Sequence, residues 1–314
     1  MTARKVTIGT RGSALALKQT EMVKAALLAQ NPDLDIDVRI IVTTGDRRTD
    51  VPLDQVARVA GIADKGVFLK EIEHALETGD IDFAVHSLKD MPSALDPKFQ
   101  LSAVLPRAQV DDVLIRRADA PAKISCVATG SVRRRYMGQR YWDNDTQFVN
   151  IRGNVTTRLT KLVESTEFDA MILAKAGLDR LGLYAPETEW QGVPITMQPL
   201  PKEHFVPAAG QGVIGIETRI DDAETQHLLQ SINHEPTFRC IRAEREFLRL
   251  LGADCSTPIG AYAYAKEGAV SLHILLFTED GKQPFQGFAM GTDPEGLAHQ
   301  LWESYQASQS TYGA

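Results

Sequence analysis

Segments with strand character and segments with helix character alternate along most of this chain, and this alternation restricts its fold more than any other feature. Strands are expected at residues 4–9, 35–42, 81–86, 113–117, 123–128, 146–151 and 168–174. Helices are expected after Ser13, over 66–78 with Gly79 closing it, from Ser131 and from Asn154, judged by apolar spacing and capping residues. Alternation of this kind predicts α/β architecture with largely parallel sheets.

The last third of the chain has a different pattern. Two helices are expected at about 221–232 and 236–251, then strand-like runs at 259–266, 269–278 and 284–291, then a helix from about 294. Strands in direct succession favour an antiparallel sheet, so a small α+β domain is expected here. Before it, residues 186–209 contain five prolines and are interpreted as a crossing segment rather than a core element.

Composition excludes several classes of protein. The 314 residues suffice for two or three domains, and 43% hydrophobic with 24% charged residues is typical of globular proteins. The net charge of −7 argues against a nucleic-acid partner. Three cysteines without a CxxC pair fit neither a disulfide framework nor a zinc site, and no metal site is expected. With no apolar signal region and no membrane-length apolar stretch, a cytoplasmic protein without a membrane partner is expected.

Arginine makes up 21 of the 34 basic residues, and six arginines lie within 26 residues: Arg133, Arg134, Arg135, Arg140, Arg152 and Arg158. The first three open an expected helix, and Arg152 precedes another. Helix N-termini attract anions. An arginine at a helix N-terminus is unfavourable with respect to the helix dipole, and it destabilises the helix unless an anion is bound nearby. The cluster therefore predicts an anion site, shared with Arg11 and Ser13 at the first strand–helix junction. The alternative is an ordinary solvated helix face.

The motif HSLKDMP at residues 86–92 follows directly on an expected strand. Ligands of open α/β sheets collect beyond the carboxyl ends of strands, where Lys89 and Asp90 lie. One interpretation is a carboxylate held in a cleft beside a cation, where it could stabilise a positive intermediate. The other is a solvated Lys–Asp turn.

Two further motifs also have two interpretations each. Cys255 lies in a loop-like sequence between a helix and a strand, so a reactive or modified thiol competes with a small buried hydrophobe. The motif GQGVIG at 210–215 has dinucleotide-fingerprint spacing, but a proline-rich segment precedes it and a strand-like run follows it. Glycines at a tight backbone crossing explain it better.

Nine segments, taken together, resemble the porphobilinogen deaminase (hydroxymethylbilane synthase) family, in the family's order and over nearly the whole chain. They are TRGSALAL at 10–17, TTGDR at 43–47, DKGVFLKEIE at 64–73, HSLKDMP at 86–92, ATGSVRR at 128–134, IRGNVTTRL at 151–159, ILAKAGLDRLGL at 172–183, PAAGQGVIGIE at 207–217 and CSTPIGAYA at 255–263. No single match is decisive, but nine in series are very specific.

The resemblance implies a fold of two periplasmic-binding-protein-like α/β domains and a small C-terminal α+β domain with an antiparallel three-stranded sheet. In that family the chain enters the first domain, passes through the second, and returns to the first before the third. The corresponding domains here are 1–105 with 204–220, 106–203, and 221–314.

The resemblance also implies a transferase of tetrapyrrole (haem or chlorophyll) biosynthesis. It would join four porphobilinogen molecules head to tail with loss of ammonia and release hydroxymethylbilane. Growth starts on a dipyrromethane cofactor attached by a thioether to a cysteine, which position and order make Cys255. Porphobilinogen is then the small-molecule partner, and a monomer is expected.

Carried over residue by residue, the resemblance makes Asp90 the catalytic carboxylate. Loss of ammonia from an aminomethylpyrrole leaves an azafulvenium cation, which a fixed carboxylate stabilises. A chain of six pyrroles carries about twelve carboxylates, which arginine forks suit. The implied cofactor-binding residues are Cys255, Lys89, Thr129, Ser131, Arg133 and Arg134. The implied substrate-binding residues are Arg11, Ser13, Gln19, Lys65, Arg152, Arg158 and Arg180, with Lys65 in the family's mobile loop.

One position departs from the family pattern. Two small residues, often glycines, usually precede the cofactor cysteine, whereas Ala253 and Asp254 stand here. An aspartate beside the thiol would tend to raise the pKa of the thiol. Attachment of the cofactor is still expected, because the cysteine and the following PIG are present.

Two other classes of function are weighed against the enzyme. A receptor that closes on a carboxylated solute without chemistry would explain the α/β halves and the arginines, but neither Cys255 nor the third domain. An NAD-dependent oxidoreductase would rest on GQGVIG alone.

Overall fold

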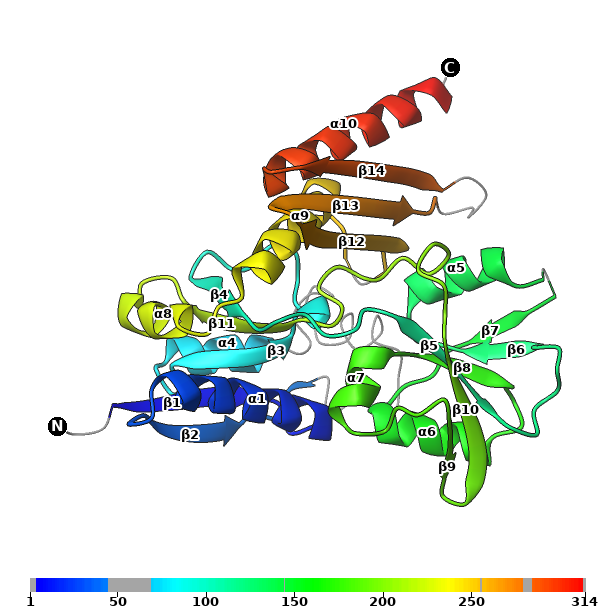
Figure 1. The fold of residues 1–314 in the computed structure, drawn as a ribbon, viewed down its shortest axis with the longest axis horizontal. Coiled ribbons are helices and arrows are strands. Elements are labelled where there is room, and N and C mark those ends of the chain that lie inside the picture. Colours follow the sequence, from blue (N-terminus) through cyan, green and yellow to red (C-terminus); the bar gives the residue numbers. More distant parts are fainter. Residues whose placement is uncertain (1–3, 45–68, 144, 255, 279–283, 313–314) are drawn as a thin grey trace.

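The computed structural model describes residues 4–44, 69–143, 145–254, 256–278 and 284–312. Three separate sheets organise these residues into two α/β domains and a small C-terminal α+β domain, which confirms the predicted fold class. Figure 1 shows the two α/β domains side by side, with the third sheet and its long helix at the top of the view. Within the described ranges, no helix is long and apolar enough to cross a membrane.

The first domain is built on a five-stranded sheet of order β2-β1-β3-β11-β4. Its strands are β1 (Lys5–Thr10), β2 (Asp35–Ile40), β3 (Phe83–Ser87), β4 (Phe99–Val104) and β11 (Ile214–Arg219). Helices α1 (Ala14–Gln30) and α8 (Ala223–Gln230) cover one face, where Val23 and Leu27 pack against Ile8 and Leu229. Helix α4 (Lys70–Glu77) covers the other, where Ile72 and Leu76 pack against Ala84.

The second domain is built on a six-stranded sheet of order β7-β6-β8-β5-β10-β9. Its strands are β5 (Asp112–Arg117), β6 (Cys126–Ala128), β7 (Gln147–Val149), β8 (Ala170–Ala174), β9 (Glu187–Trp190) and β10 (Val193–Pro199). Its helices are α5 (Val132–Tyr141), α6 (Val155–Glu164) and α7 (Lys175–Arg180). The predicted capping residues are confirmed: Ser13, Ser131 and Asn154 each accept a backbone N–H at the start of α1, α5 and α6.

The third domain combines an antiparallel sheet with two long helices. Strands β12 (Ile259–Lys266), β13 (Ala269–Leu276) and β14 (Phe285–Gly291) pair in sequence order, as predicted. Helices α9 (Glu235–Leu251) and α10 (Pro294–Tyr312) pack on one face of this sheet, with Phe247, Leu272 and Leu301 in the shared core. Gly252 ends α9 in the left-handed conformation, immediately before the loop that leads to β12.

Two strand predictions are wrong. The first two sheets are mixed rather than largely parallel, since β11 runs antiparallel to β3 and β4, and β5 runs antiparallel to β8 and β10. Residues 186–209 are also not merely a crossing, because they contain the hairpin β9–β10. Pro194 and Pro199 lie near the ends of β10, where a missing N–H is tolerated, and Ile195 and Met197 between them are buried. The crossing proper begins after β10.

Candidate active site

The expected site residues follow the carboxyl ends of parallel strands in both α/β domains. In the first domain β1 and β3 are parallel neighbours, and Arg11 and Asp90 lie just beyond them. In the second domain β6 is parallel to β7 and β8, and Thr129, Arg152 and α7 follow these three strands. Carboxyl ends of parallel strands are where α/β sheets bind ligands. Both halves of the candidate site therefore have the topology of a ligand site.

Lys89 and Asp90 lie in a short 3-10 helix, Leu88–Asp90, directly after β3. Both side chains keep exposed surface, while Leu88 anchors the turn in the core. Protein surrounds Lys89 closely enough that desolvation lowers the pKa of its amino group to about 8, although Asp90 opposes this shift. Arg134, Asp112 and Arg133 of the second domain also act on the pKa of Lys89.

Arg133 and Arg134 are buried side chains in the first turn of α5, each 5% exposed. Both form ion pairs with Asp112, the first residue of β5: Arg133 Nη2 lies 2.7 Å from Oδ2 and Arg134 Nη2 lies 2.8 Å from Oδ1. Burial alone would raise the pKa of Asp112, but the two guanidinium charges outweigh it and hold that pKa well below its usual range. Asp112 is the internal anion that lets two arginines begin a helix.

The second strand–helix junction lies beside the first. The backbone N–H of Thr129 donates to the carbonyl of Val149 at 2.9 Å, and Thr129 Oγ1 accepts the N–H of Ser131. Arg158 is partly buried in α6, and burial lowers the pKa of its guanidinium to about 10. Arg134 and Arg152 lower the pKa of Arg158 further, whereas Asp90 raises it. The charges of Asp90 in the first domain and of Arg134 and Arg152 in the second therefore all act on Arg158.

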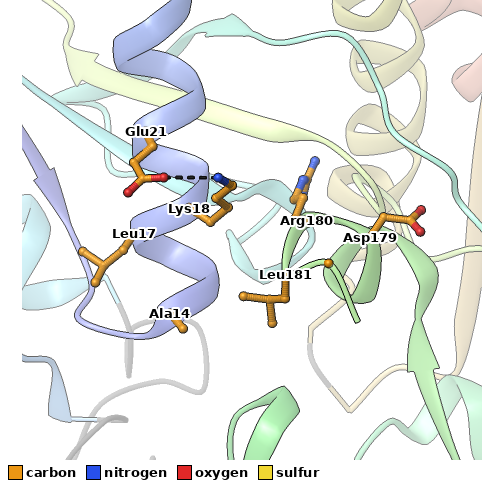
Figure 2. A pocket seen from close by; sticks show the side chains of 8 residues that line it. Ala14, Leu17, Lys18, Glu21, Asp179, Arg180 and Leu181 are labelled. Carbon is orange, nitrogen blue, oxygen red and sulfur yellow. Dashed lines mark hydrogen bonds and ion pairs between the residues drawn. The ribbon is translucent and has the colours of Figure 1, made fainter. Parts of the chain in front are cut away.

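The remaining members of the predicted set lie around the first junction and α7. Gln19, 2% exposed, donates from Nε2 to Ser87 Oγ at the end of β3, 2.9 Å away. Arg180, at the end of α7, donates from Nη2 to the carbonyl of Gly212 at 2.7 Å, and burial lowers its pKa to about 10. Figure 2 shows Lys18 of α1 and Arg180 on opposite walls of a hollow of about 490 Å³ between these helices. Glu21 and Asp179 also line this hollow, and Lys18 pairs with Glu21, so the charges of its lining balance.

Several predicted residues are not brought into this group. Arg135 and Arg140 are exposed, and Arg135 lies over the ring of Tyr136. Cys255 and Lys65 lie outside the described residues. Beside the cysteine, the Asp254 carboxylate accepts hydrogen bonds from the backbone and hydroxyl groups of Ser256 and from the hydroxyl of Thr257. The unusual aspartate is thus engaged in folding its own turn.

Sequence reasoning missed two residues of this site. Asp112 is fully buried although charged, and its position inside the apolar run VDDVLI was the available signal. Gln211 is 1% exposed and donates from Nε2 to Asp112 Oδ1 at 2.9 Å and to the carbonyl of Val110 at 2.6 Å. Gln211 was hidden because GQGVIG was considered only for its glycines.

Fold and site together define a class: a three-domain protein in which two α/β domains face each other across a cationic ligand site, with an α+β domain attached. Two family models match the chain, "Porphobilinogen deaminase, dipyromethane cofactor binding domain" over residues 6–227 and "Porphobilinogen deaminase, C-terminal domain" over residues 238–304. The chain belongs to the porphobilinogen deaminase family.

Individual relatives agree with this assignment. The chain is 41% identical to the porphobilinogen deaminase of Geobacillus kaustophilus over 302 residues, which covers 95% of this chain and 92% of the relative. It is 43% identical to that of Chlorobium luteolum over 279 residues, covering 87% and 83%. Among solved structures, the effector-binding domain of BenM with benzoate matches 74% of this chain and 91% of that chain at 13% identity, with a TM-score of 0.44. So low a score supports no inference.

The family membership confirms the predicted activity. The protein is a transferase of tetrapyrrole biosynthesis that makes hydroxymethylbilane, and its cofactor is dipyrromethane. The residues present suit a polycarboxylate of this kind. Within the described part of the chain, Lys89 and Arg158 form no ion pair, and the buried Nε of Arg180 has no hydrogen-bond partner. Among the described residues, no group of His, Cys, Asp and Glu could hold a metal ion.

Proposed function

We propose that Asp90 is the catalytic carboxylate of hydroxymethylbilane synthesis and that the surrounding cations bind the acid groups of substrate and cofactor. One observation carries the proposal: Asp90 lies in the exposed turn directly beyond the carboxyl end of β3, where α/β sheets bind ligands. A carboxylate at this position faces the cations that would hold the substrate. Neither Lys89 nor Asp90 makes a hydrogen bond or ion pair within the described part of the chain, so both are available to a ligand.

The sign of the charge on each side chain determines the role that we assign to it. Loss of ammonia from porphobilinogen leaves a cation on the substrate, and the Asp90 carboxylate stabilises that cation and accepts or returns a proton near the pyrrole nitrogen. Lys89, Arg133 and Arg134, with Thr129 and Ser131, hold the acid groups of the cofactor. When bound through Cys255, dipyrromethane supplies a pyrrole carbon as the nucleophile.

The carboxylates of the substrate bind the cations that line the other side of the site. We assign them to Arg152, Arg158 and Arg180, with Arg11, Ser13 and Gln19 from the first domain and with Lys65. Placing the acids in fixed forks holds the reacting carbons in one orientation, which lowers the entropic cost of joining them.

The wider assignments complete the proposal. The domains are 1–105 with 204–220, 106–203, and 221–314, with α8 of the last range packed against the first sheet. The protein acts as a cytoplasmic monomer, with porphobilinogen as its partner and with neither nucleic acid nor membrane bound.

The role of Asp90 is tested by Asp90→Asn, which removes the charge and keeps the shape. Release of hydroxymethylbilane should fall at least about a hundredfold, because stabilisation of a developing charge is lost. The thermal midpoint should not move, because Asp90 is exposed. Asp96→Asn is the matched control, an exposed aspartate in the same loop whose carboxylate only accepts the N–H of Lys98. Turnover near the wild-type rate in Asp90→Asn would remove Asp90 from the mechanism.

A further inference from the structure

Asp112 is a fully buried carboxylate between Arg133 and Arg134, yet it belongs to no predicted set. It is 0% exposed, and its two oxygens are divided between two arginines. Oδ1 accepts from Nε of Arg134 at 3.0 Å and from Nη2 of Arg134 at 2.8 Å, while Oδ2 lies 2.7 Å from Nη2 of Arg133. One buried carboxylate thus fixes two guanidinium planes.

The same two arginines use their other nitrogens on backbone carbonyls. Arg134 Nη1 donates to the carbonyl of Ile172 at 3.0 Å, and Arg133 Nη1 donates to that of Val206 at 2.8 Å. A guanidinium has five N–H donors, so each side chain keeps donors beyond those spent on these anchors. The anchors settle the orientation of each fork. Arg133 Nη1 and Nη2 also contact Met137 Sδ and the Gln211 side-chain oxygen, so its Nε remains for a ligand carboxylate, together with the second N–H of Nη1 and of Nη2 of Arg134.

Gln211 connects this group to the crossing segment between the α/β domains. Its amide donates to Asp112 Oδ1 at 2.9 Å and its carbonyl oxygen accepts from Arg133 Nη2 at 3.4 Å. The adjacent Gly210, at φ +72°, leaves no room for a Cβ, which would lie 3.0 Å from the backbone nitrogen of Lys89. The segment that holds Asp112 therefore also packs against the Lys89–Asp90 turn.

We propose that Asp112, held in place by Gln211, is a positioning residue that orients Arg133 and Arg134 for the carboxylates of the dipyrromethane cofactor. The inference rests on the proposed binding roles of these arginines. A single negative charge between two positive ones removes most of their mutual repulsion and still leaves a net positive charge for an incoming acid. Preorganisation of this kind raises affinity because the forks lose little freedom on binding.

The decisive variant is Asp112→Asn. An amide has one acceptor oxygen and one donor NH₂ group, so the NH₂ must face the donors of one arginine, and the charge that held both is lost. The fraction of purified protein that carries the cofactor, read from the intact mass, should fall about tenfold, and KM for porphobilinogen should rise more than kcat falls.

A matched control separates positioning from general stability. Glu217→Gln alters another carboxylate that is 0% exposed, one that pairs with His86 Nε2 at 3.0 Å and does not contact the arginines. Both variants should lose thermal stability, but Glu217→Gln should keep full cofactor occupancy. Equal loss of occupancy in the two variants would show a structural role and overturn the inference, as would full occupancy with unchanged KM in Asp112→Asn.

Gln211→Leu keeps every charge and removes the amide that bonds Asp112, the carbonyl of Val110 and Arg133. It decides the matter if Asp112→Asn fails to fold. It should lower occupancy in the same direction by a smaller factor, and unchanged occupancy would contradict the inference. Wild-type protein provides the separate check on the proposed function. If the wild-type protein carries the cofactor and the Arg133→Gln and Arg134→Gln variants carry it at the same occupancy, the proposed binding roles fail. That result would stand whatever the Asp112 variants show.

Discussion

Lys89 shows how the surroundings of one residue set the pH range in which the site can bind acids. Desolvation lowers the pKa of its amino group to about 8, against the opposing effect of Asp90. The amino group is therefore charged below pH 8 and loses its charge as the pH rises through 8. We expect KM for porphobilinogen to rise over this range, because a neutral amine attracts carboxylates weakly.

Lys89→Arg is the variant that isolates this effect, since a guanidinium remains charged throughout. The rise of KM above pH 8 should disappear from its pH profile, whatever its absolute KM. A profile with the same rise as the wild-type protein would assign the titration to another group. The control is Lys98→Arg, an exposed lysine paired with Glu77 far from the candidate site.

At the scale of elements, the crossing segment depends on close backbone approach. In Gly210→Ala the new Cβ would lie 3.0 Å from the carbonyl carbon of Leu88 and the nitrogen of Lys89, at φ +72°. Gly268→Ala, at φ +81° in the β12–β13 turn, meets nothing within 4 Å. The second change should cost about 1–2 kcal/mol for the left-handed conformation alone.

Gly210→Ala should cost at least about 1 kcal/mol more than that, through the added clash, and should also slow turnover, because the displaced backbone carries Asp90. Urea unfolding and steady-state rates measure the two effects. Equal stability losses in the two variants, with turnover intact in both, would show that the close approach at Gly210 does not matter.

Elements also show which parts of the fold could be predicted. Helices with a capping residue and helical spacing, such as those beginning at Ala14 and Val155, were predicted because their signals are local. The hairpin β9–β10 was missed because its prolines dominate the segment, although Gln191 and Gly192 at positive φ form its two-residue turn. Strand β4 and helix α7 were not predicted. The mixed direction of the strands was also missed, because the direction of each strand depends on partners far along the chain.

At the scale of the whole molecule, a buried ion pair joins the third domain to the two segments in which the chain passes between the α/β domains. Glu244 of α9, 0% exposed, forms an ion pair with Arg107 and accepts the N–H groups of Gly210 and Ala263, each at 2.7 Å. Glu244→Gln leaves Arg107 without its counter-charge, so the free energy of unfolding should fall by about 3–5 kcal/mol.

Glu246→Gln is the control for that measurement, because Glu246 pairs with Arg249 on the same helix near the surface. It should cost no more than about 1 kcal/mol in urea unfolding. Similar small losses in both variants would mean that the Glu244 pair does not hold the domains together.

The net charge of −7 illustrates why composition alone misleads at this scale. It gave no sign of a site where the charges of Lys89, Arg133, Arg134 and Arg158 act on one another. Residue order located most of these cations at strand and helix ends. Their shared carboxylate, Asp112, could not be paired with them from sequence, because the contact joins β5 to α5.

The proposed mechanism requires a covalent dipyrromethane on Cys255. The most direct measurement is the intact mass of the purified protein, followed by the mass of the peptide that contains residues 252–258. One adduct of two linked pyrroles is expected on Cys255, and none is expected in Cys255→Ser. An active protein with an unmodified peptide at Cys255 would contradict the proposed mechanism.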